Sequence, residues 1–379
     1  MIKAILKKIL PVKMRKNLFL AYNKARIATI DKILFPEFYI PESSFFLYKK
    51  VSPLKDFNIR LDDGDDPIVN KYLSYWNEWT EEEYIYIHKE GGLIEPSGWH
   101  ITKDGKLNYY SLGLSRAPHN LKPSYRKLKG KKNIIEADRI ISLRDTGDEN
   151  YFHFYNDVLA KLFLLKKHGF IIEEYQILVS GVQMRKSFFT YYTEHHPELK
   201  KLNWLVQEET EYVTANEIVF SKPETHRMDL LLPIVAPFKI EHSASSENPK
   251  KIFLSRDPKR LRFIENMEEL KPVLQEYGYP VFDADNLSLT EQIALFGKTD
   301  YLIGIHGAGF TNLLYTNHLK VLVEIFPPTS EPWLPFHYGL MAKQLGVKYI
   351  PLIGEPPQKS YSGGFRVKPE ALKAAMERI

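Results

Sequence analysis

The second half of this sequence alternates short apolar segments with amphipathic segments, and this alternation constrains the fold more than any other feature. The apolar segments have the length and composition of buried strands. They are Lys251–Ser255, Tyr279–Asp283, Tyr301–Ile305 and Val321–Phe326. Strands and helices that alternate in this way predict a parallel sheet with helices on both faces.

Capping residues mark two of the intervening helices. Asn266 is followed three residues later by Glu269, and Ser288 by Glu291, which is the spacing of a capping box. Gly278 is placed to end the first of these helices. Two further helical segments are expected, Phe310–Tyr315 and Leu334–Leu345.

The first half alternates less regularly but fits a second α/β unit. Arg139–Leu143, Gln176–Ser180 and Glu217–Phe220 have strand character, and Tyr151–His168 is predicted to be a helix that ends at Gly169. Irregular, aromatic-rich sequence precedes them.

Two domains are expected, because 379 residues exceed the size of one ordinary hydrophobic core. The polar segment His242–Lys250 is the natural linker. We therefore expect an N-terminal α/β domain over residues 1–241 and a C-terminal Rossmann-like domain over 250–355. We expect the tail, residues 356–379, to pack back on the N-terminal domain.

Composition excludes several classes of protein. With 44% hydrophobic residues the chain is not disordered, and without cysteine it has neither disulfides nor a cysteine-ligated zinc site. The net charge of +5 suits an anionic ligand or surface but does not indicate a nucleic-acid binder. The absence of cysteine fits the reducing cytoplasm, where we expect the protein to reside.

The N-terminus has the pattern of a basic amphipathic helix. Its apolar residues recur at helical spacing, with lysines and arginines between them. The apolar residues are Ile2, Ile5, Leu6, Ile9 and Leu10. No segment reaches the roughly 18 apolar residues of a membrane span, and no signal-peptide cleavage site follows. Two interpretations stay open: a helix at an anionic membrane surface, on its inner face, or a solvated helix packed on its own domain.

Polar and glycine residues follow the predicted strands of the second half. Arg256 comes directly after the first strand, His306-Gly307-Ala308-Gly309 after the third, and Glu324 lies near the end of the fourth. In an open parallel sheet, ligands bind beyond the carboxyl ends of the strands. Backbone amides at the glycines and the guanidinium of Arg256 would hold a diphosphate. Glu324 would accept hydrogen bonds from ribose hydroxyls.

Each of these features also has an ordinary structural explanation. A glycine-rich connection from strand to helix is often only a tight turn. Arg256 next to Asp257 would form a local surface pair, and Glu324 would be a solvated strand end. Their convergence on one edge of a sheet favours a ligand site. Donors fixed there would stabilise the charge on a departing diphosphate more than the charge of the bound substrate.

Several longer motifs resemble glycosyltransferase family 61, in its capsular polysaccharide biosynthesis form. They are NYFHFYNDVLAKLFLL, SRDPKRLRFIEN, LSLTEQIALFGKTDYLIGIHGAGFTNLLY and VLVEIFP, in the order expected for that family, between Gly92 and Phe326. Four residues depart from the family pattern: Phe310, Ala160, Lys161 and Met267.

The resemblance implies a GT-B architecture, with two Rossmann-like domains facing a central cleft. It implies inverting transfer from a nucleotide sugar, with UDP as the usual nucleotide, to an oligosaccharide or polysaccharide in surface polysaccharide synthesis, without a metal cofactor. Carried onto this sequence, the donor-binding positions are Arg256, Arg262, Asn266, His306, Gly307, Ala308, Gly309, Asn312 and Glu324.

Inverting transfer also needs a base that takes the proton of the acceptor hydroxyl, and we expect it from the N-terminal domain. His153 and Asp157 are four residues apart and share one face of the predicted helix. Either could act alone, Asp157 could orient His153, or the base could be another residue. The ordinary alternative pairs Asp157 with Lys161 and makes His153 a helix-start residue in an aromatic cluster.

Two Asp-x-Asp motifs have the spacing that binds a divalent metal in other transferases. Asp63-Gly64-Asp65 lies in an acidic turn, where a solvated loop is the simpler explanation, and Asp283-Ala284-Asp285 follows a strand. In GT-B enzymes of the resembled type, protein cations and helix dipoles stabilise the diphosphate in place of a metal ion. We therefore expect no metal at either motif.

Single features of the sequence also suggest three other functions. A nicotinamide-dependent oxidoreductase fits poorly, because Asn312 replaces the third glycine of the dinucleotide motif and Glu324 comes too soon after it. An α/β-hydrolase fails, because the sequence contains no G-x-S-x-G. A non-catalytic glycan-binding or scaffold protein of the same fold stays open.

Overall fold

The computed structural model divides the chain into two compact units. It describes residues 45–53, 80–112, 132–145, 147, 149–242, 249–329, 334–358 and 363–379, with part of the segment between residues 14 and 33. Within these ranges, unit 1 contains Phe45–Ser52 and Glu81–Leu230, and unit 2 contains Leu231–Ile379. Each unit is described separately below.

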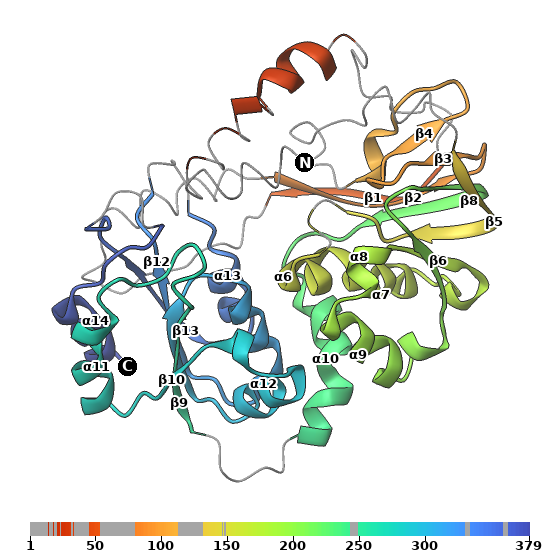
Figure 1. Ribbon diagram of the computed structural model, residues 1–379. Coiled ribbons are helices and arrows are strands. Elements are labelled where there is room, and N and C mark those ends of the chain that lie inside the picture. The colour runs from red at the N-terminus through yellow and green to blue at the C-terminus, as the bar shows by residue number, and fades with distance from the viewer. Residues whose placement is uncertain are drawn as a thin grey trace. The chain divides into compact units, whose positions relative to one another are not determined.

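Unit 2 contains the predicted parallel sheet. Its five strands are β9 (Lys251–Leu254), β10 (Val281–Phe282), β11 (Tyr301–Ile305), β12 (Val321–Phe326) and β13 (Lys348–Ile353), in the order β10-β9-β11-β12-β13 and all parallel (Figure 1). The four strands predicted from the sequence are present, and β13 is a fifth that the sequence analysis did not identify.

Helices cover this sheet. They are α11 (Met267–Glu276), α12 (Leu289–Phe296), the 3₁₀ helix η8 (Ala308–Tyr315), α13 (His337–Gln344) and α14 (Pro369–Glu377). The capping box of Ser288 and Glu291 is present, and Gly278 adopts φ +73 just after α11, as predicted. The capping box expected at Asn266 is wrong, because its side chain accepts no hydrogen bond from a backbone N–H of α11; instead, its Nδ2 donates to Oε2 of Glu269 at 2.9 Å.

The C-terminal tail does not pack where we expected. Leu372, Ala375 and Met376 of α14 are buried in the hydrophobic core of unit 2, together with Leu270 and Leu274 of α11. Residues 363–379 are therefore part of the second α/β unit, because the apolar face of α14 completes its core.

Unit 1 contains a mixed sheet. Its strands are β1 (Phe45–Pro53), β2 (Thr80–His88), β3 (Gly92–Ile94), β4 (His100–Thr102), β5 (Asn133–Ser142), β6 (Gln176–Ser180), β7 (Asn203–Gln207) and β8 (Glu211–Lys222). The order is β1-β2-β8-β5-β6-β7; β3 also pairs with β8, and β4 pairs with β3. Strands β8, β5, β6 and β7 are parallel, whereas β2 and β3 run antiparallel to β8.

The helix predicted over Tyr151–His168 is present but not regular. It begins as α6 (Tyr151–His153), continues as a π-helical segment η4 (Phe154–Leu159) and ends as α7 (Ala160–Lys167). Short 3₁₀ helices among the described residues of this unit are η2 (Tyr109–Ser111), η5 (Ile172–Glu174) and η6 (Leu199–Lys201). The helices α8 (Gly181–Met184) and α9 (Ser187–His195) connect β6 to β7.

The helix α10 (Met228–His242) contains the boundary between the units, which falls between Leu230 and Leu231. The boundary therefore lies at lower residue numbers than the predicted linker, His242–Lys250. Most of that linker is outside the described residues. The π-helical segment η1 (Ile27–Asp31) lies near the N-terminus.

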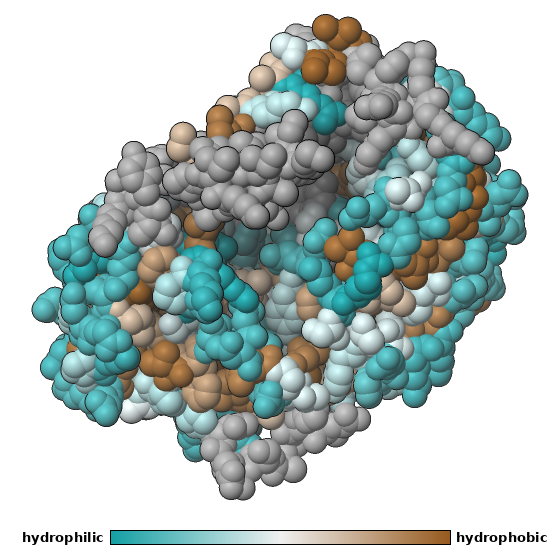
Figure 2. Space-filling model, viewed as in Figure 1, coloured by the Kyte–Doolittle hydropathy of each residue, from teal (hydrophilic) through white to brown (hydrophobic). Residues whose placement is uncertain are grey.

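No helix in the described part of the chain has the length and apolarity needed to cross a bilayer. Most of the predicted N-terminal amphipathic helix, residues 1–13, lies outside the described residues. Met14, Leu18 and Tyr22 follow it in the sequence, have helical backbone conformation, and are each more than half exposed. On the face of the molecule in Figure 2, hydrophobic residues are otherwise scattered among hydrophilic ones, as is usual for a protein surface.

Candidate functional site

The sheet of unit 2 has a topological switch point between β9 and β11. The chain passes from β9 to β10 on one side and then returns to β11 on the other side of β9. Arg256 lies two residues beyond β9, and His306 directly follows β11. Gly304 permits the two strands to approach, because a Cβ there would collide with the backbone of Leu254. This edge of an open α/β sheet is where ligands are expected.

The guanidinium group of Arg256 packs against the backbone of Gly307. A Cβ at position 307 would collide with Nη2 of Arg256, so only glycine leaves room for this approach. Nη1 of Arg256 donates to the carbonyl oxygen of Leu261 at 3.2 Å. The predicted convergence of Arg256 and the HGAG loop is therefore present in unit 2.

Arg256 is one of three arginines on the loop after β9. Burial and the charges of Arg262 and Arg260 lower the pKa of Arg256 to about 10. Burial of its guanidinium also lowers the pKa of Arg262, although the residue as a whole is exposed. Within the described chain, Arg260 pairs with Asp285, whereas neither Arg256 nor Arg262 has a carboxylate in ion-pair range. Two neighbouring cations that form no ion pair with a described carboxylate favour an anionic ligand.

Arg262 is also held in an unusual backbone conformation. Its φ is +67, a left-handed value that costs a non-glycine residue roughly 1 kcal/mol. The N–H of Arg262 donates to the carbonyl oxygen of Gly363 at 2.7 Å, and the N–H of Phe365 donates to the carbonyl oxygen of Phe263 at 2.9 Å. The C-terminal segment thus holds the arginine loop in place.

Free backbone amides lie at the start of η8. His306 donates its N–H to Ile325 at 2.8 Å, and Phe310 donates to Gly307 at 3.0 Å. Between them, the N–H groups of Gly307, Ala308 and Gly309 have no acceptor among the described residues. The start of a helix with unpaired amides is a binding site for anions.

His306 is held from behind by a buried carboxyl group. Its Nδ1 lies 2.5 Å from Oε1 of Glu324, and the hydroxyl of Tyr349 donates to Oε2 of Glu324 at 2.6 Å. The His306 ring stacks on Phe326, with centroids 5.0 Å apart. Burial and the charges of Arg262 and Arg256 lower the pKa of His306 to about 3, and burial raises the pKa of Glu324.

This arrangement corrects the expected role of Glu324. The residue is 0% exposed and both its oxygens are used, so it does not offer hydrogen bonds to a ribose. The sequence contains a signal that could have shown this. A single carboxylate inside the apolar run of β12 cannot be a solvated strand end and needs a buried partner.

Two predicted donor-site asparagines also have structural partners. Nδ2 of Asn266 donates to the carbonyl oxygen of Val367 at 2.8 Å, and the N–H of Val367 donates back to Oδ1 at 3.0 Å. Nδ2 of Asn312, which is fully buried, donates to Oε1 of Gln292 at 2.7 Å. Six of the nine expected donor residues lie together at the sheet edge: Arg256, Arg262, His306, Gly307, Ala308 and Gly309. The other three, Asn266, Asn312 and Glu324, are occupied by hydrogen bonds within the protein.

The acidic motif after β10 has a structural role in the same loop. Asp283 accepts hydrogen bonds from the N–H groups of Asp257 and Asp285, each at 3.1 Å. Asp285 pairs with Arg260. Among the residues that the structure describes, no group of three or more potential metal ligands is gathered. The other motif, Asp63-Gly64-Asp65, lies outside the described residues.

In unit 1, His153 and Asp157 contact each other through Nδ1 and Oδ2, across the start of η4. Asn156 donates to Oδ1 of Asp157 at 2.8 Å and also bonds to Thr225 and to the N–H of His226. Asp157 does not pair with Lys161, which pairs with Asp145, so that part of the ordinary alternative is wrong. The His153 ring does lie against the ring of Phe152, with centroids 5.4 Å apart. A π-helical turn of this kind frequently marks a functional site.

Lys161 instead supports the carboxyl edge of the unit 1 sheet. Its buried Nζ donates to Oδ2 of Asp145 and to the carbonyl oxygen of Arg144, both at 2.9 Å. This edge contains a polar cleft of about 320 Å³, lined by residues that follow β5, β6 and β7. They include Arg144, Asp145, Ser180, Gly181, Gln207 and Glu209.

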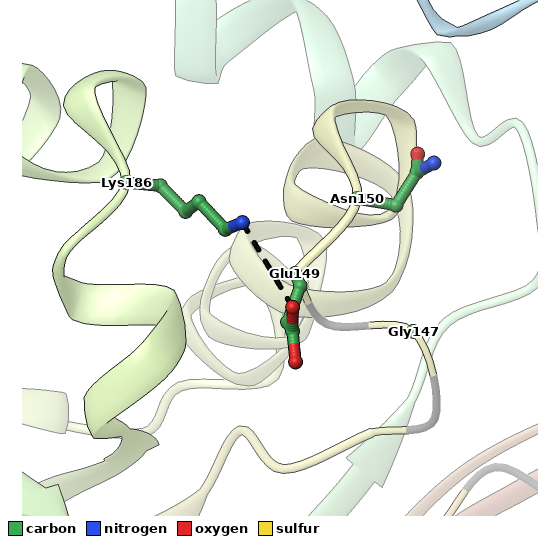
Figure 3. Close-up of a pocket in the computed structure, with 4 residues that line it drawn as sticks. All are labelled: Gly147, Glu149, Asn150 and Lys186. Atoms are coloured by element: carbon green, nitrogen blue, oxygen red, sulfur yellow. Dashed lines mark ion pairs between the residues drawn. The ribbon is translucent and has the colours of Figure 1, made fainter. Parts of the chain in front are cut away.

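A second hollow adjoins this cleft and shares Gly147 and Glu149 with it. Figure 3 shows Lys186 pointing toward Glu149, and their charged groups are 3.8 Å apart. Asn150, at the start of α6, caps the helix by accepting from the N–H of Phe152 at 2.9 Å. The helix that presents His153 therefore begins at the margin of these hollows.

Comparison with known proteins agrees with the predicted family. Residues 151–323, from α6 into β12, match the family model described as Glycosyltransferase 61. The match contains His153, Asp157, the arginine loop and the HGAG loop, and it ends one residue before Glu324.

Curated relatives are glycosyltransferases of plants and animals. The alpha-1,3-arabinosyltransferase XAT2 of Oryza sativa subsp. japonica is 29% identical over 106 residues, which are 27% of this chain and 18% of the relative. The beta-1,2-xylosyltransferase XYXT1 of the same plant is 21% identical over 226 residues, 53% of this chain and 47% of the relative.

The EGF domain-specific O-linked N-acetylglucosamine transferase of Drosophila melanogaster is 29% identical over 118 residues, 31% of this chain and 22% of the relative. The matched regions thus span less than half the length of each of these relatives. Together with the family model, they support the predicted family and the predicted enzyme class, a glycosyltransferase.

Proposed function

With the similarity to glycosyltransferase 61 as the premise, we propose that this protein transfers a sugar from a nucleoside-diphosphate sugar to a glycan, with inversion. The observation that carries the proposal is the pair Arg256 and Arg262, which form no ion pair with a carboxylate among the described residues. They lie beside the amides of Gly307–Gly309, which have no acceptor in the same part of the chain. A diphosphate supplies the negative charge and the acceptor oxygens that this edge of the sheet lacks.

The chemistry of transfer fits such a site. Negative charge accumulates on the diphosphate as the glycosidic bond breaks, and fixed guanidinium and amide donors stabilise that charge. Because Arg256 is already positioned by Gly307 and Leu261, little reorganisation is needed when the charge develops.

For the base, we propose the pair of His153 and Asp157. A carboxylate on Nδ1 fixes the imidazole in the tautomer whose Nε2 can accept a proton, and it stabilises the imidazolium that then forms. Asp157 thus orients His153, which is one of the alternatives that the sequence left open.

The finer properties rest on the resemblance. We propose a UDP-sugar as donor, a GT-B architecture, no metal cofactor, and a role in capsule or other surface polysaccharide synthesis in the cytoplasm. Binding to an anionic membrane surface is proposed for the N-terminal helix. The exposure of Met14, Leu18 and Tyr22 at four-residue spacing beside basic residues supports it.

The decisive experiment is binding of nucleoside diphosphates, measured by calorimetry and thermal shift. UDP, GDP and ADP are each titrated against the parent protein, Arg256→Ala, Arg262→Ala and Lys259→Ala. Lys259 is an exposed cation on the same loop and serves as the matched control. We expect UDP to raise the melting temperature of the parent.

We expect each arginine substitution to weaken UDP binding at least tenfold, and Lys259→Ala to weaken it less than threefold. Release of UDP from UDP-sugars in the presence of glycan acceptors would then identify transfer. Binding of glycans without affinity for any of the three nucleotides would favour the scaffold function and end the proposal.

A further inference from the structure

We propose that Glu324 and Tyr349 are positioning residues that hold His306 as the neutral tautomer with its proton on Nε2, so that His306 donates a hydrogen bond to the leaving diphosphate. The inference rests on the proposed function for the identity of the ligand. It adds a defined protonation state for three residues, and it assigns a role to Tyr349, which lies beyond the region matched by the family model.

The sheet register brings the three residues together. Gly304 of β11 pairs with Glu324 of β12, and Leu322 of β12 pairs with Tyr349 of β13. His306 is two residues beyond Gly304, so its side chain projects on the same face of the sheet as that of Glu324. The chain of contacts from Tyr349 through Glu324 to Nδ1 of His306 therefore crosses three adjacent strands.

Burial decides which atoms of Tyr349, Glu324 and His306 carry protons. Glu324 is fully buried, and no lysine or arginine of the described chain forms an ion pair with it. An ionised carboxylate is costly in such surroundings unless a cation neutralises it. Arg256 and Arg262, together with burial, oppose a charge on His306. A neutral carboxylic acid beside a neutral imidazole satisfies both constraints.

The hydrogen-bond geometry then fixes the tautomer. A protonated Glu324 donates from Oε1 to Nδ1 of His306, and its carbonyl oxygen Oε2 accepts from the Tyr349 hydroxyl. With Nδ1 acting as acceptor, the single ring proton of His306 must lie on Nε2. The histidine thereby presents a donor on the edge of its ring that is turned away from Glu324.

A donor at this place is what an anionic leaving group needs. The opposite tautomer would present the lone pair of Nε2 to the phosphate oxygens and repel them. The proposed state instead adds a hydrogen bond to those of the arginines and amides, and the phosphate charge strengthens it. No proton has to move during the reaction for this stabilisation to operate.

The first test is nuclear magnetic resonance of the protein labelled with ¹⁵N-histidine, without any ligand. His306 is identified by the signals that disappear in His306→Gln. We expect the chemical shift of a protonated Nε2 and an unprotonated Nδ1 near neutral pH. A proton on Nδ1, or a doubly protonated ring, would overturn the inference.

The second test compares two substitutions of Glu324. In Glu324→Gln the amide can donate to Nδ1 while its oxygen accepts from Tyr349, so it copies the protonated acid. We expect it to keep the Nε2 tautomer and to bind UDP within about threefold of the parent. In Glu324→Leu we expect a mixture of tautomers and at least tenfold weaker UDP binding.

Tyr349→Phe separates positioning from packing, because it removes only the hydroxyl. We expect a shift in the Nε2–H signal of His306 and a severalfold loss of UDP affinity. Because the buried Oε2 of Glu324 loses its donor, the melting temperature should also fall, and affinity is measured well below it. If Glu324→Gln loses the tautomer as Glu324→Leu does, Glu324 acts as a carboxylate and the inference is wrong.

The proposed tautomer and the proposed function are tested by separate measurements, so one can be refuted without the other. A parent protein with the Nε2 tautomer but no affinity for nucleoside diphosphates would refute the proposed function and leave the protonation state standing. A parent protein that binds UDP but has the ring proton of His306 on Nδ1 would refute this inference and leave the proposed function standing.

Discussion

The guanidinium group of Arg256 occupies the space that a side chain at position 307 would fill. Gly307 itself has an extended backbone, with φ 165 and ψ 174, which any residue can adopt. The need for glycine at this position therefore comes from the arginine and not from backbone strain. A second glycine two residues further, Gly309, has no such constraint, because a Cβ there would lie 3.6 Å from Ala284 in ordinary contact.

The first prediction uses this difference. Gly307→Ala should displace Arg256 and weaken binding of UDP at least tenfold, about 1.4 kcal/mol. In the absence of ligand, Gly309→Ala should leave the melting temperature within a degree or two of the parent, whereas Gly307→Ala should lower it. Calorimetry with UDP and thermal unfolding without ligand measure the two effects. Equal UDP affinity in Gly307→Ala and the parent would contradict the placement of Arg256 at the ligand.

Asn266 provides a test of structural support. Asn266→Ala removes both hydrogen bonds to the backbone of Val367 and leaves buried groups unpaired, which should cost about 2 kcal/mol of unfolding free energy. Urea unfolding measures this loss, and Asn286→Ala, at an exposed asparagine, should change stability by less than about 0.5 kcal/mol. Affinity for UDP should be nearly unchanged under folding conditions. A large loss of affinity with full stability would instead place Asn266 at the donor.

The buried pair of His306 and Glu324 predicts a dependence of stability on pH. Burial raises the pKa of Glu324 above 4.5, so above that pH the folded state keeps a proton that the unfolded state has lost. Stability from this group therefore falls as the pH rises. The pKa of His306 is lowered from 6.5 to about 3, so its contribution falls as the pH drops below 6.5. Together the two groups contribute most between pH 4.5 and 6.5.

The measurement for this prediction is the free energy of unfolding in urea from pH 5 to 8. Glu324→Gln should gain stability relative to the parent as the pH rises, by up to about 1.4 kcal/mol per pH unit. Glu370→Gln, at an exposed glutamate, should follow the parent at every pH. If the free energy of unfolding of Glu324→Gln instead falls relative to that of the parent as the pH rises, Glu324 is ionised in the folded protein.

The proposed base predicts an effect on turnover without an effect on donor binding. His153→Ala and Asp157→Asn should each lower kcat at least a hundredfold while the Kd for UDP stays within about threefold of the parent. Asp157→Asn should be the milder of the two, because the imidazole survives but loses its orientation. If neither substitution slows turnover in an assay of sugar transfer, the base is another residue.

Much of unit 2 was predictable from local sequence. Runs such as Tyr301–Ile305 and Val321–Phe326 are apolar over the length of a buried strand, and the structure places both strands at these bounds. Ser288 with Glu291 and the glycine at 278 mark helix ends through short-range hydrogen bonds and backbone freedom. Such signals act within a few residues, and the sequence contains them completely.

Unit 1 was harder to predict because its sheet joins segments with different periodicities. Strands β2 and β8 are antiparallel and pair residues that are more than a hundred positions apart, such as Tyr84 and Lys222. The π-helical turn in Phe154–Leu159 has no distinct local pattern. Packing of the aromatic side chains around it decides its geometry, and the sequence does not display that packing.

The sequence by itself determined which residues follow the strands of unit 2, and so placed Arg256, His306 and the glycines at one sheet edge. Tertiary structure alone decided which of the polar residues face that edge. Asn266 is bonded to a backbone 101 positions away, and Glu324 turns toward His306 and Tyr349. The reason is physical: a local pattern fixes where a strand ends, whereas the partner of a buried polar group depends on strands and loops that meet only after folding.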